Sequence, residues 1–326
     1  MTATEGLSRT AALIVRRLLA VRPREQVALV CDPASEMGMV RALAREVEDV
    51  GGEFTILQQP DRELQNKNRL TPVIERGLEA ADCLIGLTRS GGAPTYSAAV
   101  KQLLEDKRLR SISMVMRSLD NFTSGGALAD YDELYRDGQA LAELWRPARS
   151  VHLTAPAGTD LRASFGGQEV IIECGFATEP GLEAAFSDGE VSKMPAEGSA
   201  EGLLVIDGPI AHLGNSDSPV GLQVEAGRVV EVEGSGRVAD GLRELFSTVE
   251  HASNIAEIGI GLNGACRRNG DFEEEKKARG NVHVAIGDNV FYGGDVRCAV
   301  HMDMVIYRPT VSFDGRAVVD EGRVLI

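Results

Sequence analysis

The feature that most constrains the fold is a regular alternation of short apolar strands and amphipathic helices that runs to about residue 145. Apolar runs between turn residues predict buried strands, and apolar residues at helical spacing predict helices. The predicted strands are 26–31, 53–57, 81–87 and 110–116, and the predicted helices are 35–50, 70–80, 97–106 and 130–144. Such an alternation predicts a parallel sheet with helices on both faces.

The pattern changes near residue 148, where short strands between Gly, Pro and Asp turns replace the alternation. One helix is predicted at 241–250. The predicted strands are 151–153, 161–165, 170–174, 203–207, 220–225, 228–233, 256–262, 282–286, 299–306, 310–313 and 323–326. The sequence therefore predicts an α/β protein with two domains. Residues 1–148 form a parallel-sheet α/β domain with substrate-contacting loops, and residues 149–326 form a strand-rich α+β domain that binds metal and carries out catalysis.

Composition excludes several classes of partner. The formal net charge is −15 and the sequence pI is about 4.9, whereas a nucleic-acid-binding protein needs a basic face. No apolar run approaches the roughly 18 residues of a membrane-spanning helix. The N-terminal residues resemble an amphipathic helix rather than a signal peptide, and the five cysteines have no CxxC spacing. We expect a cytoplasmic protein with free thiols and a small-molecule substrate.

The first predicted strand is not followed by the glycine-rich turn of a dinucleotide-binding fold. Ligands of parallel sheets nevertheless bind at the carboxyl ends of the strands. Arg89 and Arg117 follow two of these ends. They are candidates for binding an anionic group of a substrate, and the alternative is that both are solvated loop residues.

The candidate chemistry is concentrated in the last third of the chain. His301 and Asp303 are two residues apart on a predicted strand, so their side chains share one face. A carboxylate among apolar neighbours is costly unless a metal ion or another cation compensates its charge. Imidazole and carboxylate together suit a borderline divalent metal.

Two further apolar strands each carry one group that can bind metal, namely Glu257 and His283. Each alone reads most simply as a core, edge or solvated residue. Burying all of them separately would cost several kcal/mol each, and one shared cation removes most of that cost. We therefore predict a metal site built from these strands.

Two acidic segments could add to the site. Glu190 lies in a glycine-rich stretch that suits a loop carrying a carboxylate, although an exposed acidic turn is the simpler interpretation of this residue alone. The charged run 271–277 is predicted to be a solvated loop or lid, from which Glu275 could reach inward as a general base.

Three segments together resemble a known superfamily: 256–263 (AEIGIGLN), 280–289 (GNVHVAIGDN) and 301–303 (HMD). The superfamily contains the aminopeptidase T metallopeptidases and the 2,5-dihydroxypyridine 5,6-dioxygenases. The resemblance is strongest over about 187–315, and it implies a metal-dependent enzyme that forms homo-oligomers.

The two branches imply different ligand sets. The aminopeptidase branch implies Glu190, Glu257, His283, His301 and Asp303 as ligands of zinc, cobalt or manganese. That branch also has a tyrosine seven residues after the first histidine, where this chain has Val290, and Tyr292 is out of register. The dioxygenase branch implies a single Fe(II) held by His251, His301 and Asp303, which leaves positions open for O2 and substrate.

The resemblance is closer to the dioxygenase branch, because the glycine-rich segments match it and because only that branch needs His251. It implies a non-haem Fe(II) extradiol-type dioxygenase that opens a small hydroxylated N-heteroaromatic ring, with Glu257 or His283 as the acid/base and Arg89 or Arg117 as the partner of the substrate anion. The alternatives are a metallo-aminopeptidase or related hydrolase with Glu275 or a neighbour as base, and a binding protein with a vestigial site.

Overall fold

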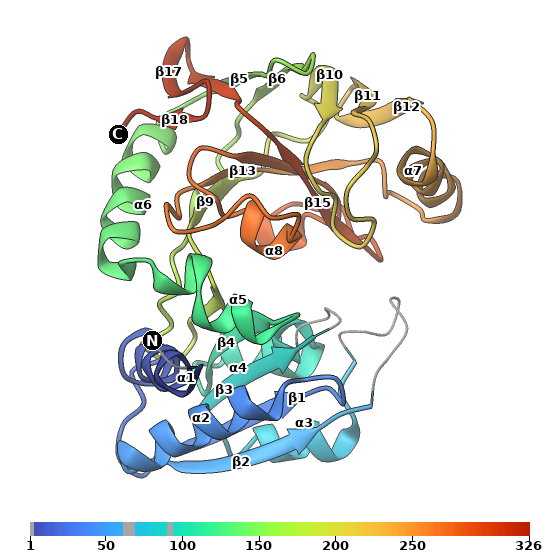
Figure 1. Cartoon of the computed structure of the whole chain (residues 1–326). Helices are drawn as coiled ribbons and strands as arrows, with labels where there is room; N and C mark the ends of the chain where they lie inside the picture. Colours follow the sequence, from blue (N-terminus) through green and yellow to red (C-terminus); the bar gives the residue numbers. More distant parts are fainter. Residues whose placement is uncertain (1–2, 61–68, 90–93) are drawn as a thin grey trace. The chain divides into compact units, whose positions relative to one another are not determined.

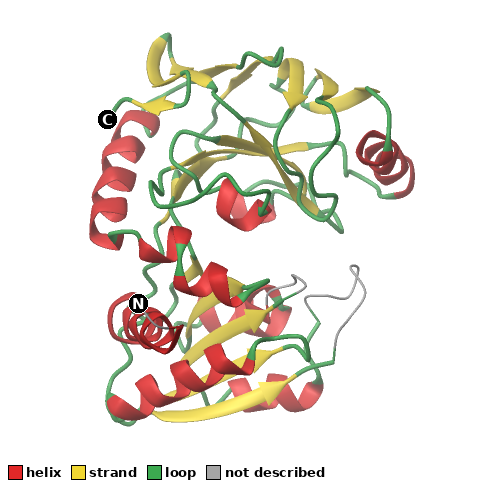
Figure 2. Cartoon of the chain, in the orientation of Figure 1, coloured by secondary structure: helices red, strands yellow, loops and turns green. Residues whose placement is uncertain are grey.

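The computed structural model describes residues 3–60, 69–89 and 94–326, and it divides into two compact units (Figures 1 and 2). Unit 1 comprises Met1–Leu128 and Cys174–Asp188, and unit 2 comprises Ala129–Glu173 and Gly189–Ile326. The boundary expected near residue 148 lies within unit 2, between the helix Tyr131–Trp145 and the strand Ser150–Thr154. Among the described residues, no helix is both long and apolar enough to cross a membrane.

Unit 1 is built on a parallel sheet, sheet A, with the strand order β2-β1-β3-β4-β8. Its strands are β1 (Gln26–Cys31), β2 (Glu53–Gln58), β3 (Cys83–Thr88), β4 (Arg110–Val115) and β8 (Glu183–Phe186). Its helices are α1 (Ala3–Ala12), the π-helical η1 (Leu13–Leu18), α2 (Met37–Asp49), α3 (Pro72–Leu78), η3 (Pro94–Tyr96), α4 (Ala98–Glu105), α5 (Leu119–Thr123) and η4 (Gly125–Leu128).

The core of sheet A follows from strand alternation. Ala28, Val30 and Leu84 are buried against apolar residues of α3 and α4 on one face. Val27, Leu29 and Cys31 point to the opposite face and are also buried. Burial on both faces explains why these strands are continuous apolar runs in the sequence. The predicted parallel α/β fold is confirmed, and β8 joins the sheet from a later part of the chain.

Unit 2 contains two antiparallel sheets. Sheet B has the order β12-β11-β10-β6-β5-β16-β17-β18, and sheet C has the order β15-β14-β13-β9-β7. The strands of sheet B are β5 (Ser150–Thr154), β6 (Asp160–Ser164), β10 (Glu201–Ile206), β11 (Val220–Glu225), β12 (Arg228–Glu233), β16 (Thr310–Phe313), β17 (Arg316–Asp320) and β18 (Arg323–Val324). Those of sheet C are β7 (Ile171–Glu173), β9 (Glu190–Lys193), β13 (Ile255–Gly261), β14 (Val282–Gly287) and β15 (His301–Ile306).

The helices of unit 2 are α6 (Tyr131–Trp145), α7 (Arg237–Thr248), α8 (Phe272–Glu275) and η5 (Val290–Tyr292). Trp145 at the end of α6 is fully buried and packs against Phe313 of β16, with ring centroids 4.6 Å apart and an interplanar angle of 34°. The strand-rich organisation predicted for the second half of the chain is confirmed. Sheet C carries the candidate site.

Candidate metal centre

Residues from four strands of sheet C converge on one face. Glu190 begins β9, Glu257 lies on β13, His283 lies on β14, and His301 and Asp303 lie on β15. Their side chains share a face because Gly261 pairs with Glu190, Gly259 pairs with His283, and Ala285 pairs with both Glu257 and Asp303. The expected loop position of Glu190 is therefore corrected, because this residue starts a buried strand.

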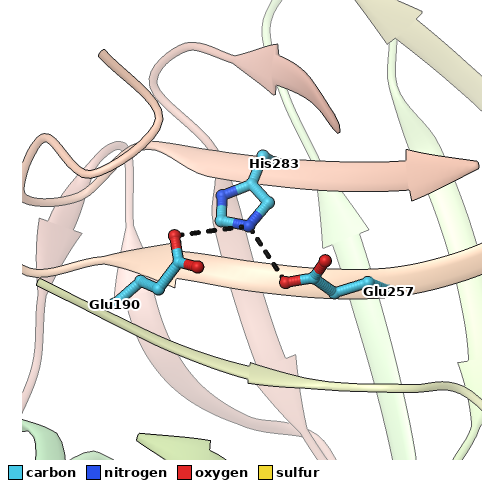
Figure 3. A group of neighbouring side chains, drawn as sticks. All are labelled: Glu190, Glu257 and His283. Atoms are coloured by element: carbon cyan, nitrogen blue, oxygen red, sulfur yellow. Dashed lines mark hydrogen bonds and ion pairs between the residues drawn. The ribbon is translucent and has the colours of Figure 1, made fainter. Parts of the chain in front are cut away.

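The inner group consists of Glu190, Glu257 and His283 (Figure 3). Nε2 of His283 lies 3.2 Å from Oε1 of Glu257 and 3.5 Å from Oε2 of Glu190, so the ring edge faces both carboxylates. All three side chains are at most 2% exposed. At this degree of burial the group offers no open side to a larger ligand.

The outer group consists of Glu257, His301 and Asp303. Nε2 of His301 lies 3.0 Å from Oε2 of Glu257 and 3.2 Å from Oδ1 of Asp303. The His301 side chain is 33% exposed, whereas the two carboxylates are buried. Glu257 thus directs one oxygen to each group.

The ring orientation of His301 is fixed from outside the group. Its Nδ1 lies 2.7 Å from the backbone carbonyl oxygen of Asp288 and must donate to it, because a carbonyl only accepts. In the neutral ring, Nε2 would then direct a lone pair at two carboxylates. Nε2 must therefore carry a proton or share a cation with Glu257 and Asp303.

The charges of the groups agree with this geometry. Burial alone would lower the pKa of His301, but Asp303 and Glu257 raise it well above its ordinary value. Burial likewise opposes ionisation of Glu257, yet the two histidines hold the pKa of this carboxyl far below its usual range. The carboxylates are therefore ionised and ready to bind a cation.

Two consecutive lysines each form an ion pair with a carboxylate of the two groups. Nζ of Lys277 lies 2.8 Å from Oε1 of Glu190, and Nζ of Lys276 lies 2.9 Å from Oδ2 of Asp303. Against the cost of burial, Lys277 and Lys276 lower the pKa of Glu190. Lys276 and His301 likewise lower the pKa of Asp303 well below its ordinary value, again against burial.

Two glycines of β13 make room for the site. A Cβ on Gly259 would overlap the imidazole of His283, and a Cβ on Gly261 would overlap the backbone of Lys277 and Ala278. Glu257, Gly259 and Gly261 share one face of β13. The pattern Glu-x-Gly-x-Gly therefore supplies one candidate ligand, a space for the imidazole of His283 and a space for the lysine segment.

The residues fit a divalent metal ion. Oε2 of Glu190 and Nδ1 of His283 are buried and make no hydrogen bond within the described part of the chain. Buried polar atoms without a partner are costly, and the Glu190 oxygen faces Nε2 of His283. Carboxylate oxygens and imidazole nitrogens gathered on one face form a donor set that suits iron, zinc or manganese.

Tyr292, in η5, is a site residue that the sequence did not assign. Its ring stacks on His301, with centroids 5.8 Å apart and an interplanar angle of 25°. Burial and the carboxylates of Glu257, Glu173 and Glu190 raise its pKa well above the ordinary value, so the phenol stays protonated near the acidic groups. The only sequence signal was an aromatic pair in a glycine-rich segment.

Within the described part of the chain, His251 belongs to neither the inner nor the outer group. It lies in the turn after α7 with a φ of 63°, and its side chain is 39% exposed, 3.5 Å from Oε1 of Glu250. The triad of His251, His301 and Asp303 therefore does not assemble in this structure. In the outer group, the third residue beside His301 and Asp303 is Glu257.

Glu275 is buried rather than solvated. It accepts hydrogen bonds from the Tyr307 hydroxyl and from the backbone N–H of Gly270. The charged run 271–277 is thus corrected from a solvated loop to a short helix, α8, followed by the partly exposed Lys276 and the buried Lys277. The charges are stable inside because each finds a partner of opposite sign or a hydrogen-bond donor.

Arg89 and Arg117 are exposed, and they follow β3 and β4 at the carboxyl ends of these strands in unit 1. The backbone N–H of Arg89 donates to Oδ2 of Asp32 at 2.7 Å, which joins the loops after β1 and β3. Their role in binding a substrate anion remains a prediction.

Fold and site together define an α/β protein with a candidate metal centre on an antiparallel sheet. Residues 13–326 match the family described as 2,5-dihydroxypyridine 5,6-dioxygenase. The chain belongs to this family. A curated relative, the 2,5-dihydroxypyridine 5,6-dioxygenase of Pseudomonas putida KT2440, is 28% identical over 205 residues, which are 57% of this chain and 57% of that protein.

Two solved structures share the fold over the whole chain. The 2,5-dihydroxypyridine dioxygenase from Pseudomonas putida KT2440 superimposes with a TM-score of 0.82 at 21% identity, covering 100% of this chain and 98% of the other. Wild-type AmpT from Thermus thermophilus gives 0.76 at 18% identity, with both chains covered completely. At these identities the likeness shows the fold alone.

Proposed function

We propose that this protein is a metal-dependent dioxygenase that opens a small hydroxylated N-heteroaromatic ring, of the kind represented by 2,5-dihydroxypyridine, with Fe(II) as its metal. The observation that carries the proposal is the outer group, where His301, Asp303 and Glu257 converge in a chain that belongs to this family. Fe(II), when bound, supplies a Lewis acid for a ring hydroxyl and a redox partner for O2.

Burial selects the outer group as the place of reaction. The inner group is closed, whereas His301 is partly exposed and can meet both an ion and a substrate. Glu257, His301 and Asp303 hold the ion, and this set has one imidazole and two carboxylates. It differs from the two-histidine face that the resemblance implied.

The neighbouring residues handle protons. His283 lies 3.2 Å from Glu257, which can pass it the proton that a ring hydroxyl loses at the outer group, because two carboxylates stabilise the charged form of His283 against the cost of burial. The Tyr292 phenol, kept protonated beside the site, can donate to a developing negative charge on the ring. Arg89 and Arg117 are proposed to bind the anionic part of the substrate.

The test is O2 consumption by protein reconstituted anaerobically with Fe(II) and then given 2,5-dihydroxypyridine, with loss of the ring absorbance followed in parallel. The expected result is stoichiometric uptake of O2 that depends on Fe(II) and vanishes in Asp303→Asn. Retention of bound iron without O2 uptake on any hydroxylated pyridine would overturn the proposed reaction while leaving the metal centre in place.

A second candidate, a metallo-aminopeptidase or related hydrolase, is favoured by one specific observation. All five ligand residues implied by the aminopeptidase branch converge, and Glu257 directs one oxygen to each group as a carboxylate shared by two ions would. Release of p-nitroaniline from aminoacyl p-nitroanilides by the zinc, cobalt or manganese form, without O2 uptake by the iron form, would establish this alternative.

A further inference from the structure

Lys276 and Lys277 form contacts that the proposed reaction leaves unused. Each ammonium group binds one oxygen of a ligand carboxylate, Lys277 on Glu190 and Lys276 on Asp303, and leaves the other oxygen directed at a histidine. Both carboxylates are thereby limited to one free oxygen. Two adjacent residues thus reach both the inner and the outer group.

The lysine segment is held in place by its backbone. The carbonyl of Lys277 accepts from the N–H of Asn263 at 2.9 Å, and the amide of Asn281 donates to the carbonyl of Glu275 at 2.9 Å. Gly261 lets this backbone approach β13. The Lys277 side chain is 4% exposed, so its charge cannot move into solvent without loss of this packing.

The charges limit how many cations the centre can accept. Three ligand carboxylates face two ammonium groups, which leaves one net negative charge when both histidines are neutral. One divalent ion changes this to one net positive charge, and a second would leave three. Like charges this close and this buried repel strongly.

We propose that Lys276 and Lys277 set the number of metal ions in the centre, because their ammonium groups supply the positive charge that a second divalent ion would bring. Lys277 is the main determinant, since it occupies the inner group. The first ion binds the outer group. This inference rests on the proposed metal centre and concerns the ion count, not the reaction.

The test is binding of Mn²⁺ alone, measured by equilibrium dialysis with metal analysis and by the electron paramagnetic resonance spectrum. Wild type is expected to bind about one ion per chain and to give the spectrum of isolated Mn²⁺. Lys277→Met keeps the aliphatic stem and is expected to bind a second ion at least about tenfold more tightly than wild type does, since one buried charge is worth more than a tenfold step. The two ions should then show magnetic coupling.

Three variants complete the design. Lys276→Met should shift the count in the same direction, and it decides the matter if Lys277→Met does not fold. Lys277→Arg keeps the charge and should keep one ion. Lys193→Met removes another buried lysine, which lies over the Phe165 ring at 5.0 Å on the opposite face of β9, and should leave the count unchanged.

The outcomes separate this inference from the proposed function. Tight binding of two ions by wild type, or an unchanged count in folded Lys277→Met and Lys276→Met, refutes the role of the lysines and leaves the metal centre standing. Failure of wild type to bind Mn²⁺ or Fe(II) refutes the metal centre and the inference together.

Discussion

Oε2 of Glu257 lies 3.0 Å from Nε2 of His301, while the other ring nitrogen of His301 is committed to the backbone of Asp288. A carboxylate and an imidazole nitrogen at this distance need a proton or a metal ion between them. A proton and a metal ion therefore compete for Nε2 of His301.

His301→Gln should lose bound metal, with iron content falling to background and O2 uptake falling by more than about 100-fold, the upper range for residues that merely support a ligand. His251→Gln is the matched comparison and should keep both, because His251 lies in an exposed turn beside Glu250. Loss of iron in His251→Gln, with His301→Gln unaffected, would reverse this assignment.

Gly259→Ala should displace His283, because the new Cβ would overlap its ring. Overpacking of this kind costs about 1–3 kcal/mol, and we expect a lower unfolding temperature together with weaker metal binding. Gly167→Ala is the control, since a Cβ there meets nothing within 4 Å. Equal stability of the two variants in calorimetry would show that the space above Gly259 is not needed.

Tyr292→Leu should weaken metal binding several-fold, because stacking on an aromatic neighbour is worth about 0.5–1.5 kcal/mol and holds His301 in place. Tyr292→Phe keeps the stacking and should keep the affinity while lowering kcat. Tyr135→Leu, at a tyrosine of α6 that is 44% exposed, should change neither. Calorimetric titration with Mn²⁺ and steady-state kinetics distinguish the two contributions of the tyrosine.

The stability of the metal-free protein should depend on pH in two directions. His301 and His283 have raised pKa values despite burial, so their stabilising contribution is full below the ordinary histidine pKa of about 6.5 and is lost as the pH rises through the raised values. Glu190, Glu257 and Asp303 have lowered pKa values, so their contribution is full above about pH 4.3 and is lost as the pH falls.

The thermal unfolding temperature in EDTA should therefore be highest between about pH 4.5 and 6.5. With Mn²⁺ present the maximum should move to higher pH, because the metal replaces the protons on the histidines. Release of protons on metal binding, measured by calorimetry in buffers of different ionisation enthalpy, checks the same exchange. An identical pH profile with and without metal would contradict it.

The parallel sheet of unit 1 could be predicted from the sequence because strands buried on both faces are continuous apolar runs, as in β1 and β3. β8 could not be predicted from the sequence, because Glu183–Phe186 is short. It pairs with β4 although all the elements from α5 to β7 lie between them in the chain. β9 was not predicted for a different reason. Glu190 and Ser192 face the site, so one side of this buried strand is polar and the segment resembles a turn.

The candidate ligands were predictable because each interrupts an apolar strand with a group that is costly to bury. Lys276, Lys277 and Tyr292 were not, because nothing in a charged run or a glycine-rich loop indicates which way the backbone returns. The glycine spacing of β13 was visible, but its meaning depends on the strand pairing that places His283 opposite Gly259.

The division of the chain has a consequence for how the protein is made. Each unit draws on two separate stretches, and sheet A is complete only once Glu183–Phe186 has been added beside β4. A ribosome must therefore have released most of both segments before either unit can close, and a truncation at residue 148 leaves β4 with an unpaired edge that invites aggregation. Separate expression of the two units therefore needs residues 1–128 joined to 174–188 for unit 1, and residues 129–173 joined to 189–326 for unit 2.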